Sequence, residues 1–73
     1  MSQNKKSKTY CILKIYQMLV NGEEFSFTYL MNEFNCSKRT CVRYIREVKA
    51  FIKDNLHKKV HYSRKNDSFI LED

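Results

Sequence analysis

The sequence has no proline, no tryptophan and a single glycine among its 73 residues. It also has no apolar run near the roughly 20 residues that a membrane-spanning helix needs, which excludes a membrane-spanning role. The sequence also lacks the usual signatures of catalysis, namely a nucleophile with a matching general base, a pair of carboxylates, and a glycine-rich phosphate loop. We therefore expect a protein that is not an enzyme and that needs no cofactor.

The cysteines Cys11, Cys36 and Cys41 are odd in number and follow no paired disulfide spacing. The N-terminus does not resemble an apolar signal segment, so we expect a reduced, cytoplasmic protein. Zinc is an alternative for the thiols together with His57 and His61, but the cysteines lack the Cys-x-x-Cys spacing of a strong site. We expect the thiols to pack in the core and the histidines to lie on the surface or the wing, with no metal bound.

Charge is unevenly distributed along this chain of net charge +6. Residues 21–36 contain three acids and no Lys or Arg, whereas residues 37–53 contain six basic residues and one acid. A surface that serves only solubility interleaves the two signs. The separation therefore predicts an anionic partner, with a merely solvated basic face as the plainer alternative.

Residues 1–7 are polar without apolar periodicity and predict a short, flexible basic tail, so that residues 8–73 form one domain. A helix is expected from Lys8 to Val20, ended by Asn21-Gly22. Its apolar stripe follows helical spacing and consists of Ile12, Ile15, Tyr16 and Leu19.

A second, short helix is expected after Ser26, which can cap it, and before Asn35, which stops it. Phe25 precedes the cap, where an apolar residue packs back on the first turn or a short strand pairs with a later hairpin. The apolar side of this helix consists of Leu30, Met31 and Phe34.

Ser37 is the next candidate cap, and the third helix is expected from Lys38 to about Asp54. On a helical wheel one side is apolar, with Cys41, Tyr44, Ile45, Val48, Phe51 and Ile52. The other side is largely basic, with Lys38, Arg39, Val42, Arg43, Arg46, Lys49 and Lys53.

The period changes after this helix, because residues 60–62 alternate, 64–67 are polar and turn-rich, and 68–71 favour a β-strand. This pattern predicts a β-hairpin. The whole order predicts a mainly α fold with a small β-hairpin, namely a winged helix-turn-helix of three helices and a C-terminal wing.

The third helix and its turn resemble the N-terminal winged helix-turn-helix of DeoR-type and WYL-domain bacterial transcriptional regulators. The matching residues are Cys36, Ser37, Lys38, Arg39, Thr40, Cys41, Arg43, Ile45 and Arg46. The segment 62–65 is similar to the wing of these families, and the likeness spans about residues 9–71. Tyr44 stands where an acid is common, and Cys36 and Cys41 replace aliphatic residues. The resemblance does not extend to the effector or WYL domain of these families, so we do not expect ligand sensing.

Resemblance and basic face together imply a sequence-specific double-stranded DNA-binding transcriptional regulator, such as a repressor from a bacterium, a phage or another mobile element. We expect base contacts from Arg39, Val42 and Arg43, with Arg43 the strongest candidate. Phosphate contacts are expected at the helix start, from Ser37, Lys38 and Thr40, and farther along the helix, from Arg46, Lys49 and Lys53. Arg64 and Lys65 at the hairpin tip are expected to contact phosphate or the minor groove.

Two further expectations concern partners. The first helix or the end of the third helix is expected to form a homodimer on a two-fold operator. The alternative function is a small inhibitor or adaptor that uses the winged helix to dock on a protein partner. Stacking of bases on Tyr10, Tyr29 and Tyr44 is a weaker alternative to core or dimer contacts.

Overall fold

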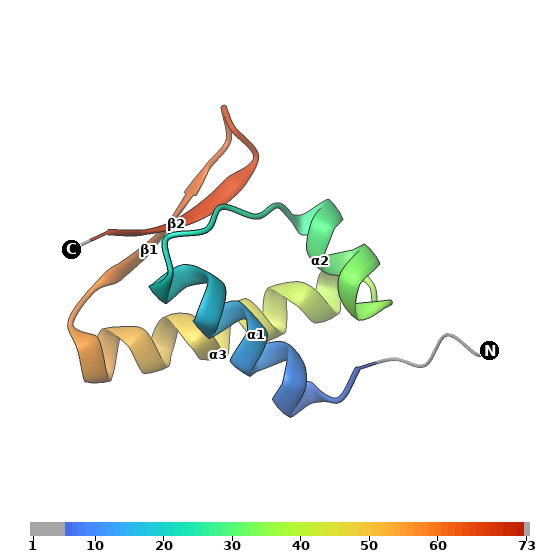
Figure 1. Ribbon diagram of the computed structural model, residues 1–73, viewed down its shortest axis with the longest axis horizontal. Helices are drawn as coiled ribbons and strands as arrows, with labels where there is room; N and C mark the ends of the chain where they lie inside the picture. Colours follow the sequence, from blue (N-terminus) through green and yellow to red (C-terminus); the bar gives the residue numbers. More distant parts are fainter. Residues whose placement is uncertain (1–5, 73) are drawn as a thin grey trace.

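The computed structural model describes residues 6–72 and contains three helices followed by an antiparallel β-hairpin (Figure 1). The elements are α1 (Lys8–Val20), α2 (Phe27–Phe34), α3 (Lys38–Leu56), β1 (Lys59–Ser63) and β2 (Ser68–Glu72). This arrangement confirms the winged helix-turn-helix that the sequence predicts. Most of the predicted tail, residues 1–5, lies outside the described residues, and the boundary between tail and domain stays a prediction.

Serine side chains cap all three helices. In each case the serine Oγ accepts a hydrogen bond from the backbone N–H three residues later, which otherwise has no partner inside the helix. The N···O distances are 3.1 Å for Ser7–Tyr10, 3.1 Å for Ser26–Tyr29 and 3.3 Å for Ser37–Thr40. The caps predicted at Ser26 and Ser37 are therefore confirmed.

Left-handed residues end two of the helices. Asn35 has a φ of 55° and ends α2, as the sequence predicts. The third helix continues past the expected end near Asp54 to Leu56, and His57 then adopts a φ of 57°. The Asn55 Nδ2 donates to the Phe51 carbonyl at 2.9 Å, so this amide binds the helix backbone and does not interrupt it.

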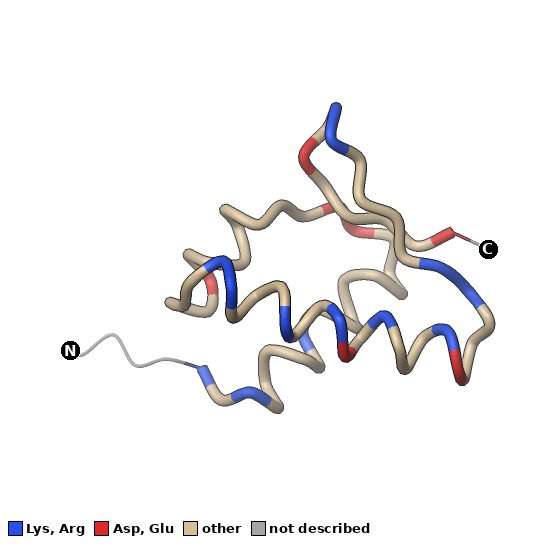
Figure 2. The backbone as a smooth tube through the Cα atoms, turned by 180° about the vertical axis from the view of Figure 1, so that it is seen from behind, with Lys and Arg blue, Asp and Glu red and all other residues tan. Residues whose placement is uncertain are grey.

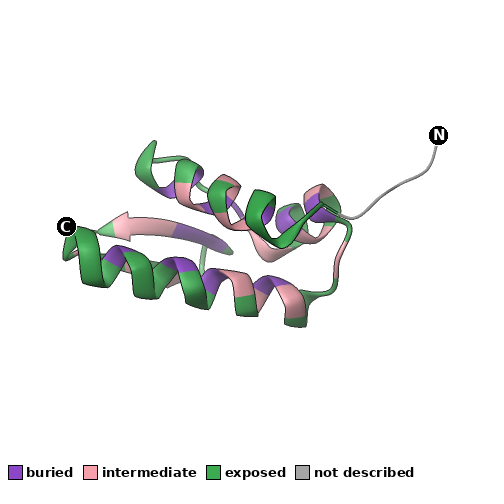
Figure 3. Cartoon of the chain, turned by 90° about the horizontal axis from the view of Figure 1, so that it is seen from below, coloured by how far each residue is buried: buried purple, intermediate pink, exposed green. Residues whose placement is uncertain are grey.

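The core lies where the three helices and the hairpin face one another, with buried residues on the inner sides of α1 and α3 (Figure 3). The buried residues of α3 are Cys41, Ile45, Val48 and Ile52. Two members of the predicted apolar side differ from this expectation, because Tyr44 is half-buried and Phe51 is 52% exposed. At about 100° per residue both lie on the flank of the apolar arc, toward α1, and the arc is narrower than predicted.

An isolated β-bridge between Phe25 and Phe69 attaches the hairpin to the helices. The Phe69 N–H donates to the Phe25 carbonyl at 2.9 Å, and the two rings stack with centroids 5.4 Å apart. Of the two roles predicted for Phe25, pairing with a later hairpin is therefore the one observed. Phe27 and Tyr62 also pack on the Phe69 ring, at 5.0 Å and 4.8 Å between centroids.

All three cysteines are free thiols; Cys11 and Cys41 are buried and Cys36 is half-buried. Within residues 6–72, no three side chains of His, Cys, Asp or Glu gather as a metal site. His57 and His61 are exposed, as expected. None of the helices in this range has the length and apolar character needed to cross a bilayer.

Candidate nucleic-acid interface

The helix-turn-helix consists of α2, the connecting residues 35–37, and α3. Asn35 turns the chain in the left-handed conformation, and Ser37, two residues later, caps α3. The Ser37 Oγ accepts from the Thr40 N–H and donates to the Thr40 Oγ1 at 3.2 Å. These bonds hold the first turn of α3, whose free N–H groups and helix dipole suit an anion.

One side of α3 carries six exposed basic residues, which we call the basic face. Figure 2 shows its Lys and Arg positions recurring along the whole length of the helix. Each of these basic side chains is exposed, and Val42 between them is half-buried. The basic face consists of Lys38, Arg39, Arg43, Arg46, Lys49 and Lys53.

The single acid in residues 37–53, Glu47, does not interrupt the basic face. Its Oε2 lies 2.8 Å from the Lys8 Nζ of α1, on the flank of α3 that faces α1. Lys38 lies at the N-terminal end of the basic face, and its ammonium nitrogen is 4.9 Å from the centre of the Phe27 ring. A cation held against an aromatic face is positioned before any ligand arrives.

The hairpin tip carries Arg64 and Lys65, both exposed, and Figure 1 shows the tip projecting away from the helices. The Tyr62 hydroxyl donates to the Asp67 Oδ1 at 2.6 Å across the base of this turn, and this hydrogen bond raises the pKa of Tyr62. The structure therefore places the predicted site residues in two groups, one along α3 and one at the tip.

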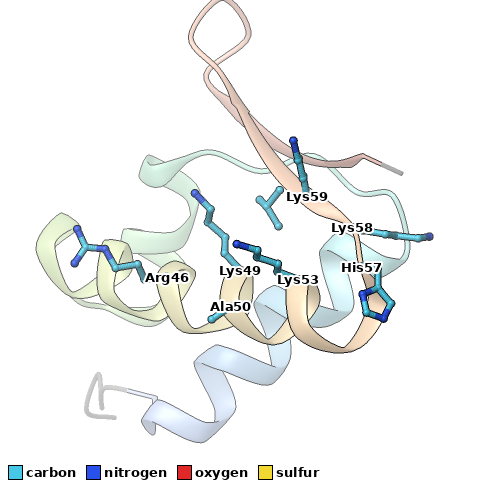
Figure 4. A pocket seen from close by; sticks show the side chains of 8 residues that line it. Arg46, Lys49, Ala50, Lys53, His57, Lys58 and Lys59 are labelled. Carbon is cyan, nitrogen blue, oxygen red and sulfur yellow. The ribbon is translucent and has the colours of Figure 1, made fainter.

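A basic cleft between α3 and β1 adds two cations, Lys58 and Lys59, to which the sequence analysis assigned no contact. Lys49 and Lys53 extend from α3 on the side of β1, where Lys59 projects from the strand (Figure 4). The cleft has a volume of about 660 Å³ and, in the described part of the chain, no Asp or Glu lines it. Its lining residues are Arg46, Lys49, Ala50, Lys53, His57, Lys58, Lys59 and Val60.

The cleft arises from the chain reversal at His57, which returns β1 along α3. The Lys58-Lys59 pair is visible in the sequence, but its position beside Lys53 depends on where the helix ends. With five cations and no acid in its lining within residues 6–72, the cleft attracts anions, and phosphates are the natural fit for lysine ammonium groups.

The cap at Ser37 gives a first testable prediction. Ser37→Ala should lower the free energy of unfolding by about 1 kcal/mol, because the Thr40 N–H loses its partner. Urea unfolding followed by circular dichroism measures this change. Thr28→Ala removes an exposed hydroxyl of α2 and serves as the matched control, with a change within about 0.5 kcal/mol. Equal effects of the two substitutions would contradict the capping role.

The fold and its basic face define a winged helix-turn-helix domain. Comparison with protein families agrees: the family model described as HTH domain matches residues 12–62, more than half of the chain. The protein thus belongs to this helix-turn-helix domain family. No curated protein and no solved structure matches the chain. Helix-turn-helix domains bind DNA, so membership indicates DNA as the partner and transcriptional regulation as the process.

Proposed function

We propose that the protein is a sequence-specific regulator of transcription that places α3 in the major groove of double-stranded DNA. The observation that carries this proposal is the basic face, exposed from Lys38 to Lys53, while the opposite side of α3 contributes Cys41, Ile45, Val48 and Ile52 to the core. The resemblance to DeoR-type and WYL-domain regulators supports a bacterial or mobile-element source and action in the cytoplasm.

The length of α3 divides the expected contacts into two kinds. Its 19 residues span about 28 Å, whereas the major groove is about 12 Å wide. Only the first turns of α3 can therefore reach base edges, and we assign this role to Arg39, Val42 and Arg43. The later basic residues and the α3–β1 cleft lie beyond the groove, beside the flanking phosphates, where contacts position the protein without specifying sequence.

Selection from random duplex DNA, followed by sequencing at two salt concentrations, tests the proposal. We expect one enriched motif with two-fold symmetry. If a subunit neutralises about five phosphates, the logarithm of the affinity falls with the logarithm of the salt concentration at a slope near −4.5. Sequence-blind binding that disappears at moderate salt would contradict a specific regulator and favour the adaptor alternative.

Two matched variants, one in the cleft and one on α1, extend the same assay. Lys53→Gln removes one charge from the basic face and should reduce the salt slope by about 0.9 while the selected motif stays the same. Lys14→Gln makes the same charge change on α1, away from the cleft, and should leave the slope unaltered. A slope that responds equally to both substitutions would assign the effect to net charge alone.

We further propose that a second copy of the chain covers an apolar groove between α1 and α3. The groove has a volume of about 340 Å³ and is lined by Ile12, Leu13, Tyr16, Glu47, Val48 and Phe51. Leu13 is 61% exposed and Phe51 is 52% exposed. No Lys or Arg of the described residues lines it, so two chains of charge +6 meet here with the least repulsion. Pairing through this flank leaves the basic face of each copy free.

Sedimentation velocity measures this pairing. The protein should sediment as a dimer. Phe51→Ser should shift it to the monomer, because a small polar side chain replaces the exposed apolar ring. Tyr29→Ser changes an exposed aromatic of α2 outside the groove and should leave the dimer intact. A protein that remains monomeric at every concentration would overturn the dimer and leave the groove to a different protein partner.

A further inference from the structure

Two of the three free thiols face each other at the point where α3 begins. Cys36 precedes the capping residue Ser37, and Cys41 is the fourth residue of α3. These two positions form the hydrophobic staple of many helices, in which apolar side chains pack across the cap. Here the staple consists of two sulfur atoms, with the Cys36 and Cys41 Sγ atoms 3.4 Å apart.

We propose that Cys36 and Cys41 are a reversible modification site, which exchange with a low-molecular-weight disulfide such as oxidised glutathione converts into an intramolecular disulfide. A disulfide has an S–S distance of about 2.05 Å, so the sulfur atoms need to approach by little more than an ångström. The cysteines lie on either side of a single cap, and Cys36 belongs to the connecting residues 35–37.

The environment of the two thiols sets the order of the steps. Cys36 is half-buried and reachable, whereas Cys41 is fully buried. Burial, and then the hydrogen bond with Cys36, raise the pKa of Cys41 to about 12. Cys36 is therefore the thiol that an external disulfide can reach, and Cys41 is the thiol that resolves the product.

The exchange balances as two displacements at sulfur. The Cys36 sulfur gives up its proton, attacks glutathione disulfide and forms a mixed disulfide. The glutathione thiolate that leaves takes up a proton. The Cys41 sulfur then attacks the Cys36 sulfur, forms the protein disulfide and releases the second glutathione, while the Cys41 proton passes to that leaving thiolate. The two protein thiols lose two electrons and two protons in total, and one glutathione disulfide becomes two glutathione thiols.

A bond at this position acts on the helix that the proposed function places in DNA, and this consequence rests on that function. Closing the staple pulls residues 35–37 toward α3 and shifts the first turn, which contains Arg39 and leads into Arg43. Loss of one bidentate contact between Arg and guanine would weaken operator binding by about tenfold or more. Reduced glutathione converts the disulfide back to two thiols and thereby restores the affinity for the operator.

Mass spectrometry of the purified full chain in glutathione redox buffers, quenched by alkylation, tests the site. We expect the protein to lose two hydrogen atoms as the buffer becomes more oxidising, with a cross-link between Cys36 and Cys41 and with Cys11 alkylated after unfolding. Excess glutathione should reverse the change. Cys36→Ala changes a half-buried position, and circular dichroism can verify that the variant folds. This substitution should abolish the disulfide, whereas Cys11→Ala should leave its formation unchanged.

Glutathione that remains attached to Cys36, or three alkylated thiols in the most oxidising buffer, would overturn the site. Operator affinity of the reduced and oxidised forms is then compared. A chain that forms the disulfide but binds no DNA in either form would refute the proposed function alone. Equal affinities of the two forms would refute the coupling between the thiol pair and α3.

Discussion

Arg43→Ala should lower the affinity for the selected DNA site by about tenfold to a hundredfold and relax the preference at one base pair. Arg43 lies in the second turn of α3, exposed, on the side away from Cys41, Ile45 and Val48. Arginine donates two hydrogen bonds to the O6 and N7 of guanine, and such a pair contributes about 1–3 kcal/mol of discrimination. Alanine removes both donors without disturbing the core.

Electrophoretic mobility shifts on the selected site and on a scrambled duplex separate the roles of the basic residues. Arg43→Ala should reduce the ratio of the two affinities. Lys49→Ala, farther along the basic face, should weaken both duplexes equally, because a phosphate contact carries no sequence information. If Arg43→Ala retained the full ratio, the assigned orientation of α3 in the groove would be wrong.

Phe34→Ala should leave the protein mostly unfolded at room temperature. Phe34 is 1% exposed at the end of α2, and its ring meets Tyr10 of α1 edge-on at 6.4 Å between centroids. Truncating a buried Phe costs about 3–5 kcal/mol. A core of this size supplies only about 3–5 kcal/mol in total, so this one cavity is comparable to the whole stability.

Thermal unfolding by circular dichroism checks this prediction. Tyr29→Ala is the matched control, because Tyr29 is also an aromatic of α2 but is 42% exposed. It should change the free energy of unfolding by no more than about 0.5 kcal/mol. A cooperative transition for Phe34→Ala close to that of the wild type would show that packing around α2 is less important than the burial of Phe34 indicates.

Features set by neighbouring residues were predictable from the sequence. The caps at Ser26 and Ser37 follow from side chains that bind amides three residues away, and Asn35 tolerates the left-handed turn that separates α2 from α3. The basic face follows from helical periodicity alone. Its DNA-binding role, and that of Arg64 and Lys65, stays a prediction.

Features that depend on distant parts of the chain were not predictable. Phe25 was compatible with two roles until the position of Phe69 was known. Phe51 has the period of a core residue, but the width of the buried arc depends on how α1 packs against α3. The basic cleft requires both the helix end at His57 and the direction of β1, and neither follows from local pattern.

The aromatic cluster at the base of the hairpin fixes the orientation of the two strands, and the residues at the tip take no part in it. Phe69 packs against Phe25, Phe27 and Tyr62, whereas residues 64–66 are exposed beyond this cluster. Changes of length or sequence at the tip therefore need not tilt the strands. The tip sequence can therefore change, in evolution or by design, and alter the contacts that flank α3 without changing the rest of the domain.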